Sequence, residues 1–119
     1  MDYLIYGIFA LIIFFLVHGM LPTKGIKQIS TLDLKQQLNH RNKQYIDVRT
    51  PGEFKVNSIR GFQNIPLQQL PNKLDGLSKE KEIIVICQSG MRSSKACRLL
   101  KKQGFQNITN VKGGMSAWS

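Results

Sequence analysis

A run of β-branched residues, Ile83-Ile84-Val85-Ile86 after Glu82, restricts the fold of this 119-residue chain more than any other feature. The run does not alternate between polar and apolar residues, which is typical of a strand covered on both faces. A sheet with such cover is mostly parallel and carries helices above and below it. The run therefore predicts an α/β domain with residues 82–86 as a central strand.

Short apolar runs alternate with helical patterns on both sides of this strand, as in βαβ units. Further strands are expected at residues 26–29, 45–48 and 105–111, and a short one is expected to begin at Ile59. Helices are expected from a cap at Ser30, with Asp33 as its capping-box partner, and over residues 68–73 and 93–103. Pro51-Gly52 is expected to open a turn or a short helix.

The N-terminal segment 3–21 contains no Asp, Glu, Lys or Arg. As a helix its 19 residues would span roughly 28 Å, which is close to the thickness of a bilayer's hydrocarbon core. A cleaved signal peptide and a buried helix are the alternatives, but Asp2 precedes the segment and its exit is a poor cleavage site. We expect a transmembrane helix at 3–21, a linker at 22–27 and a domain at 28–119.

All 17 Lys and Arg residues follow this segment, which predicts a single-pass protein of the cell membrane with its C-terminal domain in the cytoplasm. With six acidic residues after Asp2, the remainder carries a formal charge of +11. A solvated surface and attraction to an anionic inner leaflet both account for this excess. The basic residues are scattered singly, so a nucleic-acid partner is not expected.

The chain contains two cysteines, Cys87 and Cys97. A cytoplasmic domain keeps them reduced, and their spacing suits neither a disulfide framework nor a zinc site. No metal site and no cofactor are expected.

Cys87 stands at the carboxyl end of the central strand and just before a helix, where ligands bind in open α/β sheets. The helix dipole, a nest of amides made possible by Gly90, and the charge of Arg92 all favour the thiolate. The alternative is that Cys87 is a small buried apolar residue. Cys97 lies within the helix and is expected to be a packed thiol.

Four segments, in order, resemble the motifs of the rhodanese family. Cys87-Gln88-Ser89-Gly90-Met91-Arg92-Ser93 resembles its active loop, Cys-x-x-Gly-x-Arg-Ser. The other three are Asp47-Val48-Arg49-x-Pro51-x-Glu53-Phe54, Ile59-x-Gly61 with Asn64-Ile65-Pro66, and Gly113-Gly114-Met115-x-Ala117-Trp118. Together these segments cover nearly all of residues 29–118.

The resemblance implies a five-stranded parallel sheet flanked by helices and a thiosulfate sulfurtransferase with Cys87 as catalytic sulfur carrier. Residues 88–93 would bind a small sulfur-donor anion, and the acceptor would be cyanide, a small thiol or a protein thiol. Asp47, Arg49 and Glu53 would support the loop. Their own pattern leaves several roles open: Asp47 could cap the next turn, Arg49 could pair with Glu53 or bind an anion, and Glu53 could pair with Arg92.

Two departures from the family pattern are Ser58, where His is usual, and Phe62, where Ala is usual. Two other functions compete. Cysteine-dependent phosphatases and arsenate reductases use a Cys-x5-Arg loop, but Arg92 lies only five positions after Cys87 and closes a smaller ring. A non-catalytic binding module of the same fold at the membrane would be marked by loss of the cysteine, which is present here.

Overall fold

The computed structural model describes residues 2–20, 25–40 and 42–118, with the side chains of 17–20 excepted. Leu21, residues 22–24 of the expected linker, and Arg41 lie outside the described residues. The division into residues 3–21, 22–27 and 28–119 stays a prediction.

The described residues form five strands, four α-helices and three 3₁₀ helices. The strands are β1 (Ile26–Ile29), β2 (Gln44–Asp47), β3 (Gln63–Asn64), β4 (Ile83–Ile86) and β5 (Ile108–Val111). The α-helices are α1 (Asp2–Met20), α2 (Thr31–Gln37), α3 (Pro51–Val56) and α4 (Met91–Lys102). The 3₁₀ helices are η1 (Leu70–Asn72), η2 (Leu74–Gly76) and η3 (Gly114–Ala117).

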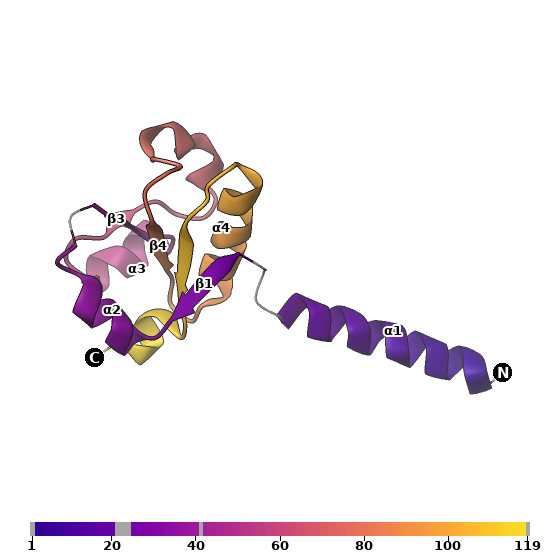
Figure 1. Cartoon of the computed structure of the whole chain (residues 1–119). Coiled ribbons are helices and arrows are strands. Elements are labelled where there is room, and N and C mark those ends of the chain that lie inside the picture. Colours follow the sequence, from indigo (N-terminus) through magenta and orange to yellow (C-terminus); the bar gives the residue numbers. More distant parts are fainter. Residues whose placement is uncertain (1, 21–24, 41, 119) are drawn as a thin grey trace.

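The strands form one parallel sheet in the order β1-β5-β4-β2-β3, so β4 lies at its centre (Figure 1). All four residues of β4 are fully buried, and they alternate between the two faces. Ile83 and Val85 pack with the apolar side of α4, whereas Ile84 and Ile86 pack with residues of α2 and η3. The predicted parallel α/β sheet with a central strand covered on both faces is confirmed.

Some elements predicted from local sequence signals are found where they were expected, and others are not. Ser30 caps α2 through a reciprocal capping box with Asp33, as expected. Ile59 does not begin a strand: it is buried in a loop, and β3 is a two-residue strand further on. Residues 68–73 do not form an α-helix, because Pro71 lacks an amide hydrogen and the chain makes short 3₁₀ turns instead.

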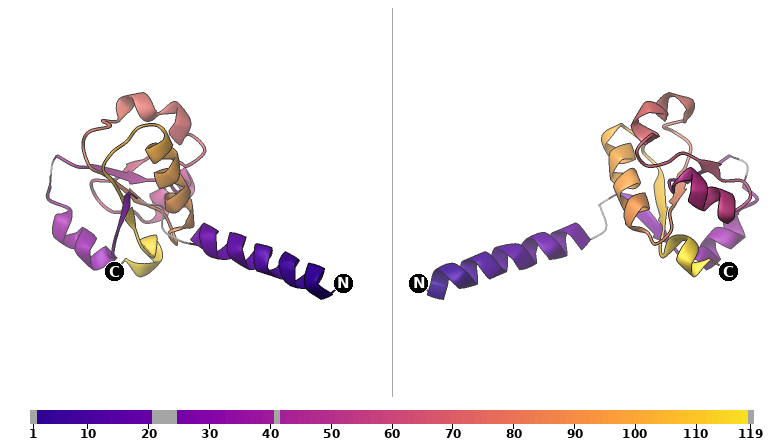
Figure 2. Two further views of the ribbon diagram at one scale, coloured as in Figure 1. Left: turned by 45° about the vertical axis from the view of Figure 1, so that its right-hand side comes forward. Right: turned by 180° about the vertical axis from the view of Figure 1, so that it is seen from behind.

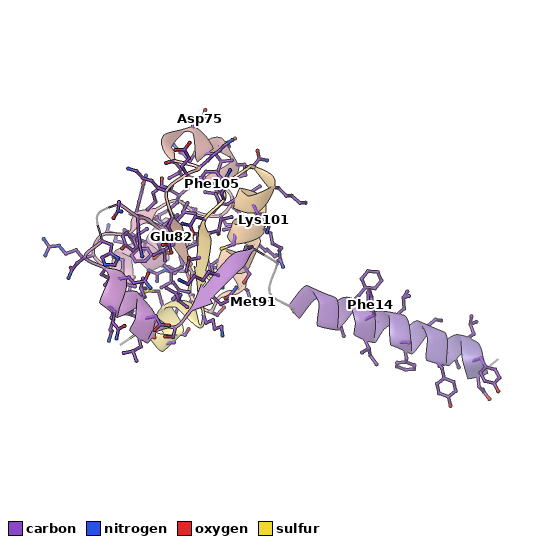
Figure 3. The ribbon with its side chains drawn as sticks, viewed as in Figure 1. Phe14, Asp75, Glu82, Met91, Lys101 and Phe105 are labelled. Carbon is purple, nitrogen blue, oxygen red and sulfur yellow. The ribbon has the colours of Figure 1, made fainter. Side chains whose placement is uncertain are left out.

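The helix α1 leaves the domain near the start of β1 and extends away from it (Figures 1 and 2). The large apolar side chains described between residues 3 and 16, for example Phe14, are exposed around the helix (Figure 3). Among the described residues, none of the helices has the length and apolar character required to cross a membrane. The helix forms where it was expected, but a membrane-spanning role for residues 3–21 is not supported.

Candidate active site

Cys87 follows β4 directly and lies beneath a tight loop. Its side chain is buried, and its Sγ accepts a hydrogen bond from the Gly90 amide at 2.9 Å. The thiol in turn donates to Ser93 Oγ at 3.3 Å. Gly90 has a φ of 105°, a left-handed conformation that glycine adopts without strain and that leads the chain from the loop into α4. The loop therefore presents a donor to negative charge on Sγ.

The first turn of α4 fixes this loop from the other side. The helix begins at Met91, so its positive end faces the loop. The hydroxyls of Ser93 and Ser94 donate to the Gly90 carbonyl at 3.1 and 2.7 Å. Hydrogen bonds thus join Cys87, Gly90, Ser93 and Ser94, whereas Ser89 and Met91 are exposed on the surface of the loop.

The C-terminal turn braces the backbone of the loop. The amides of Met115 and Ser116 donate to the carbonyls of Cys87 and Gln88, both at 2.8 Å. Gly114 makes this approach possible, because a Cβ at that position would collide with the Cys87 carbonyl, and its φ is 55°. The sequence contained this Gly-Gly pair as a family signature, but its contact with the loop was not predicted.

Arg92 forms a bidentate ion pair with Glu53 of α3. The two N–O distances are 2.7 and 3.0 Å. Glu53 also caps α3, where it accepts from the Thr50 amide at 3.1 Å. The Arg92 hydrogen bonds, followed by the Thr50 amide, lower the pKa of Glu53 from 4.5 to about 2. The stabilising effect of a charged Glu53 is therefore full above about pH 4.5 and is lost as the pH falls toward about 2.

Asp47 and Arg49 form a second ion pair, and this one is buried. Arg49 Nη2 lies 2.8 Å from Asp47 Oδ2, and Arg49 Nε lies 3.0 Å from both carboxylate oxygens. The Arg49 amide also donates to Asp47 Oδ1, so Asp47 does cap its turn. Of the pairings left open, Arg49 with Glu53 is wrong and Glu53 with Arg92 is correct.

Asn64 holds the same turn and was given no role from the sequence. Its Nδ2 donates to the carbonyls of Asp47 and Arg49 at 3.0 and 2.9 Å. Asn64 belongs to the Asn-Ile-Pro motif, which the sequence contains. Its contact with Asp47, 17 residues earlier, could not be recognised from the sequence. Asn64 therefore joins β3 to the turn that carries the buried ion pair.

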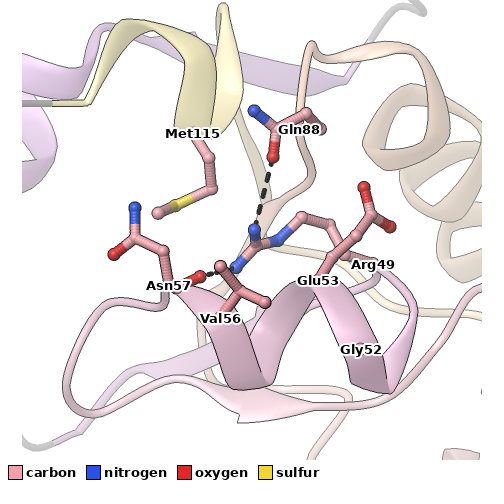
Figure 4. A pocket seen from close by; sticks show the side chains of 7 residues that line it. All are labelled: Arg49, Gly52, Glu53, Val56, Asn57, Gln88 and Met115. Carbon is pink, nitrogen blue, oxygen red and sulfur yellow. Dashed lines mark hydrogen bonds between the residues drawn. The ribbon is translucent and has the colours of Figure 1, made fainter.

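A pocket of about 480 Å³ opens beside the loop (Figure 4). Arg49 Nη1 donates to Gln88 Oε1 at 3.3 Å along one wall. The residues that line the pocket are Arg49, Gly52, Glu53, Val56, Asn57, Gln88 and Met115. Three of them were predicted site residues. Val56 and Met115 supply apolar surface. Val56 belongs to none of the motifs, and the motif that contains Met115 did not indicate its place in a pocket, which depends on how α3 and η3 meet.

Cys97 lies within α4 and belongs to the buried core. Burial raises the pKa of its thiol to about 12, so it is almost wholly protonated at neutral pH. The packed thiol expected from the sequence is confirmed.

We expect iodoacetamide at pH 7 to alkylate Cys87 well before Cys97. The Cys87 sulfur lies in the loop after β4 and accepts the Gly90 amide, whereas burial raises the pKa of the Cys97 thiol and keeps it protonated. Mass spectrometry of the two cysteine-containing peptides over time provides the measurement. Equal rates of alkylation would contradict this assignment of the reactive cysteine.

The chain resembles proteins and structures of one family over most of its length. The family model described as rhodanese-like domain matches residues 30–119. The putative sulfurtransferase YtwF of Bacillus subtilis (strain 168) is 43% identical over 94 residues, which cover 78% of this chain and 90% of the relative. A rhodanese-like domain protein from Staphylococcus aureus superposes with a TM-score of 0.73 at 34% identity, covering 78% and 91% of the two chains. The human single-domain sulfurtransferase TSTD1 superposes with a TM-score of 0.71 at 25% identity, covering 76% and 93%.

Proposed function

Because the chain belongs to the rhodanese-like domain family, we propose that it is a sulfurtransferase that carries sulfur as a persulfide on Cys87. One observation carries the proposal: Cys87 Sγ lies at the end of the central strand and accepts the Gly90 amide at 2.9 Å. Relatives named as sulfurtransferases cover most of the chain and support the same activity.

The reaction proceeds in two steps through a covalent intermediate. The Cys87 thiolate attacks the outer, sulfane sulfur of a donor, a new S–S bond forms, and the donor's own S–S bond breaks. An acceptor thiol or cyanide then takes the outer sulfur and regenerates the thiolate. The loop amide and the start of α4 stabilise negative charge on the sulfur in both steps.

Residues 88–93 would surround the persulfide, and the two ion pairs would hold the walls of the site. The donor expected from the family resemblance is thiosulfate-like, and the acceptor is cyanide in the laboratory or a thiol of a small molecule or protein in the cell. No step of this scheme requires a cofactor.

The test is the mass of the intact protein after treatment with a sulfane-sulfur donor. We expect a gain of one sulfur atom, located on the Cys87 peptide and removed by cyanide with release of thiocyanate. A protein that binds partners but gains no sulfur from thiosulfate or from an organic donor would favour the non-catalytic binding module.

We also propose that α1 attaches the protein to the cytoplasmic side of the cell membrane. Its exposed apolar side chains and the excess of basic residues after it support this location. We expect protease added to intact cells to leave the C-terminal domain uncut. Digestion of the domain from outside would contradict the orientation, and recovery of the full chain without membranes would contradict the attachment.

A further inference from the structure

The charged side chains of the site form two ion pairs with no net charge. Arg92 is held by Glu53 and Arg49 is held by Asp47, so each arginine has a carboxylate partner. The loop 87–93 and the pocket lining that the structure describes contain no further charged side chain. Lys55 and Lys112 are close in sequence to residues that line the pocket, but both lysines are exposed and solvent screens their charge. The pocket therefore offers a donor hydrogen bonds but no net positive charge.

This balance matters because sulfane-sulfur donors differ in charge. Thiosulfate is a dianion, so its reaction with the Cys87 thiolate gathers three negative charges, which end as a persulfide anion and sulfite. An organic persulfide, R–S–SH, is neutral in its protonated form. In its reaction the only negative charge is that of the Cys87 thiolate, and this charge ends on the leaving group R–S⁻. The Gly90 amide and the positive end of α4 act on either donor, but without an unpaired cation the thiosulfate reaction is opposed by repulsion that the persulfide reaction avoids.

The apolar surface of the pocket fits the same kind of donor. Val56 is 88% exposed and lines the pocket. The side chain of Met115 lies across the pocket from Val56 (Figure 4). Contact between this apolar surface and the carbon atoms of an organic substituent favours binding. Thiosulfate has no carbon to place there.

We propose that this site takes organic sulfane-sulfur donors carrying at most one negative charge, alkyl persulfides above all, in preference to thiosulfate. The inference rests on the proposed sulfurtransferase function and names its donor class. In the loading step, Cys87 Sγ bonds to the outer sulfur of R–S–SH, and the bond between the two donor sulfurs breaks. The R–S sulfur leaves with the electron pair, and the outer sulfur keeps its hydrogen, so no oxidant or reductant is consumed.

The test compares two stable donors that differ by one charge, thiosulfate and methanethiosulfonate, in which a methyl group replaces one oxygen. The full chain is assayed with cyanide as acceptor, and each kcat/KM is divided by the donor's uncatalysed rate with 2-mercaptoethanol. We expect the normalised value for methanethiosulfonate to be at least about tenfold higher, as the loss of one like-charge repulsion implies. An equal or higher value for thiosulfate would overturn the inference.

Two variants change the charge of the site in independent ways. Glu53→Gln keeps an oxygen for the Thr50 amide but releases the charge of Arg92, and Gln88→Lys adds a cation at the pocket wall. Both are expected to shift the donor ratio toward thiosulfate by about tenfold. A ratio that moves in neither variant, with methanethiosulfonate activity retained, overturns the donor class alone. Failure of either donor to load Cys87 in the unaltered protein overturns the proposed function as well.

Discussion

Replacing Arg49 with Ala is expected to lower the free energy of unfolding by about 3–5 kcal/mol, the usual cost of leaving a buried charge without its partner. The Asp47 carboxylate is fully buried, and three of its contacts come from the Arg49 side chain. Without the guanidinium, the Arg49 backbone amide is the one donor to it that remains among the described residues. Urea denaturation followed by circular dichroism gives the change in free energy.

Two controls separate this mechanism from a general effect of removing an arginine. Arg60→Ala changes an exposed residue and is expected to alter the free energy of unfolding by less than about 0.5 kcal/mol. Adding Asp47→Asn to Arg49→Ala removes the unpaired charge while keeping an oxygen for the backbone amide, and should restore a measurable part of the loss. If Arg49→Ala costs no more than Arg60→Ala, the buried pair does not stabilise the fold.

The sequence predicted the parts of this protein that depend on local pattern. A continuous β-branched run is a strong signal, because few environments other than a central parallel strand accept it, and β4 lies where it was expected. Ser30 and Asp33 similarly indicated a capping box, which needs only residues three apart. The position of the loop after β4 followed from the same logic, since Cys87 comes between a strand and a helix.

Contacts between distant segments could not be predicted. The choice between Arg49 and Arg92 as the partner of Glu53 depends on how α3 packs against the loop, and both pairings fit the spacing of charges. The contact of Gly114 with the Cys87 carbonyl depends on where the chain returns after β5. The prediction of a short strand beginning at Ile59 was wrong for a related reason. Ile59 is apolar because it is buried, and it does not pair with β2.

Replacing Cys87 with Ser is expected to reduce sulfur transfer by at least about a thousandfold, because the nucleophile itself is lost. A serine hydroxyl is a poor nucleophile without a base beside it, and its oxygen cannot hold sulfur as a persulfide. The smaller oxygen can still accept the Gly90 amide, so the fold should remain intact. Donor-dependent thiocyanate formation gives the rate, and intact-protein mass shows whether any sulfur is retained.

Cys97→Ala is the matched control, since it removes the other thiol from the same domain. Cys97 is a fully buried residue of the α4 core, so its truncation should cost about 1 kcal/mol of stability through a small cavity. Its raised pKa keeps it out of the chemistry, so the rate of transfer should be unchanged. The two variants are thus expected to have opposite effects: Cys87→Ser loses activity with stability nearly intact, and Cys97→Ala loses stability with activity intact. Persistent transfer in Cys87→Ser, or loss of transfer in folded Cys97→Ala, would place the sulfur carrier somewhere other than the loop that follows β4.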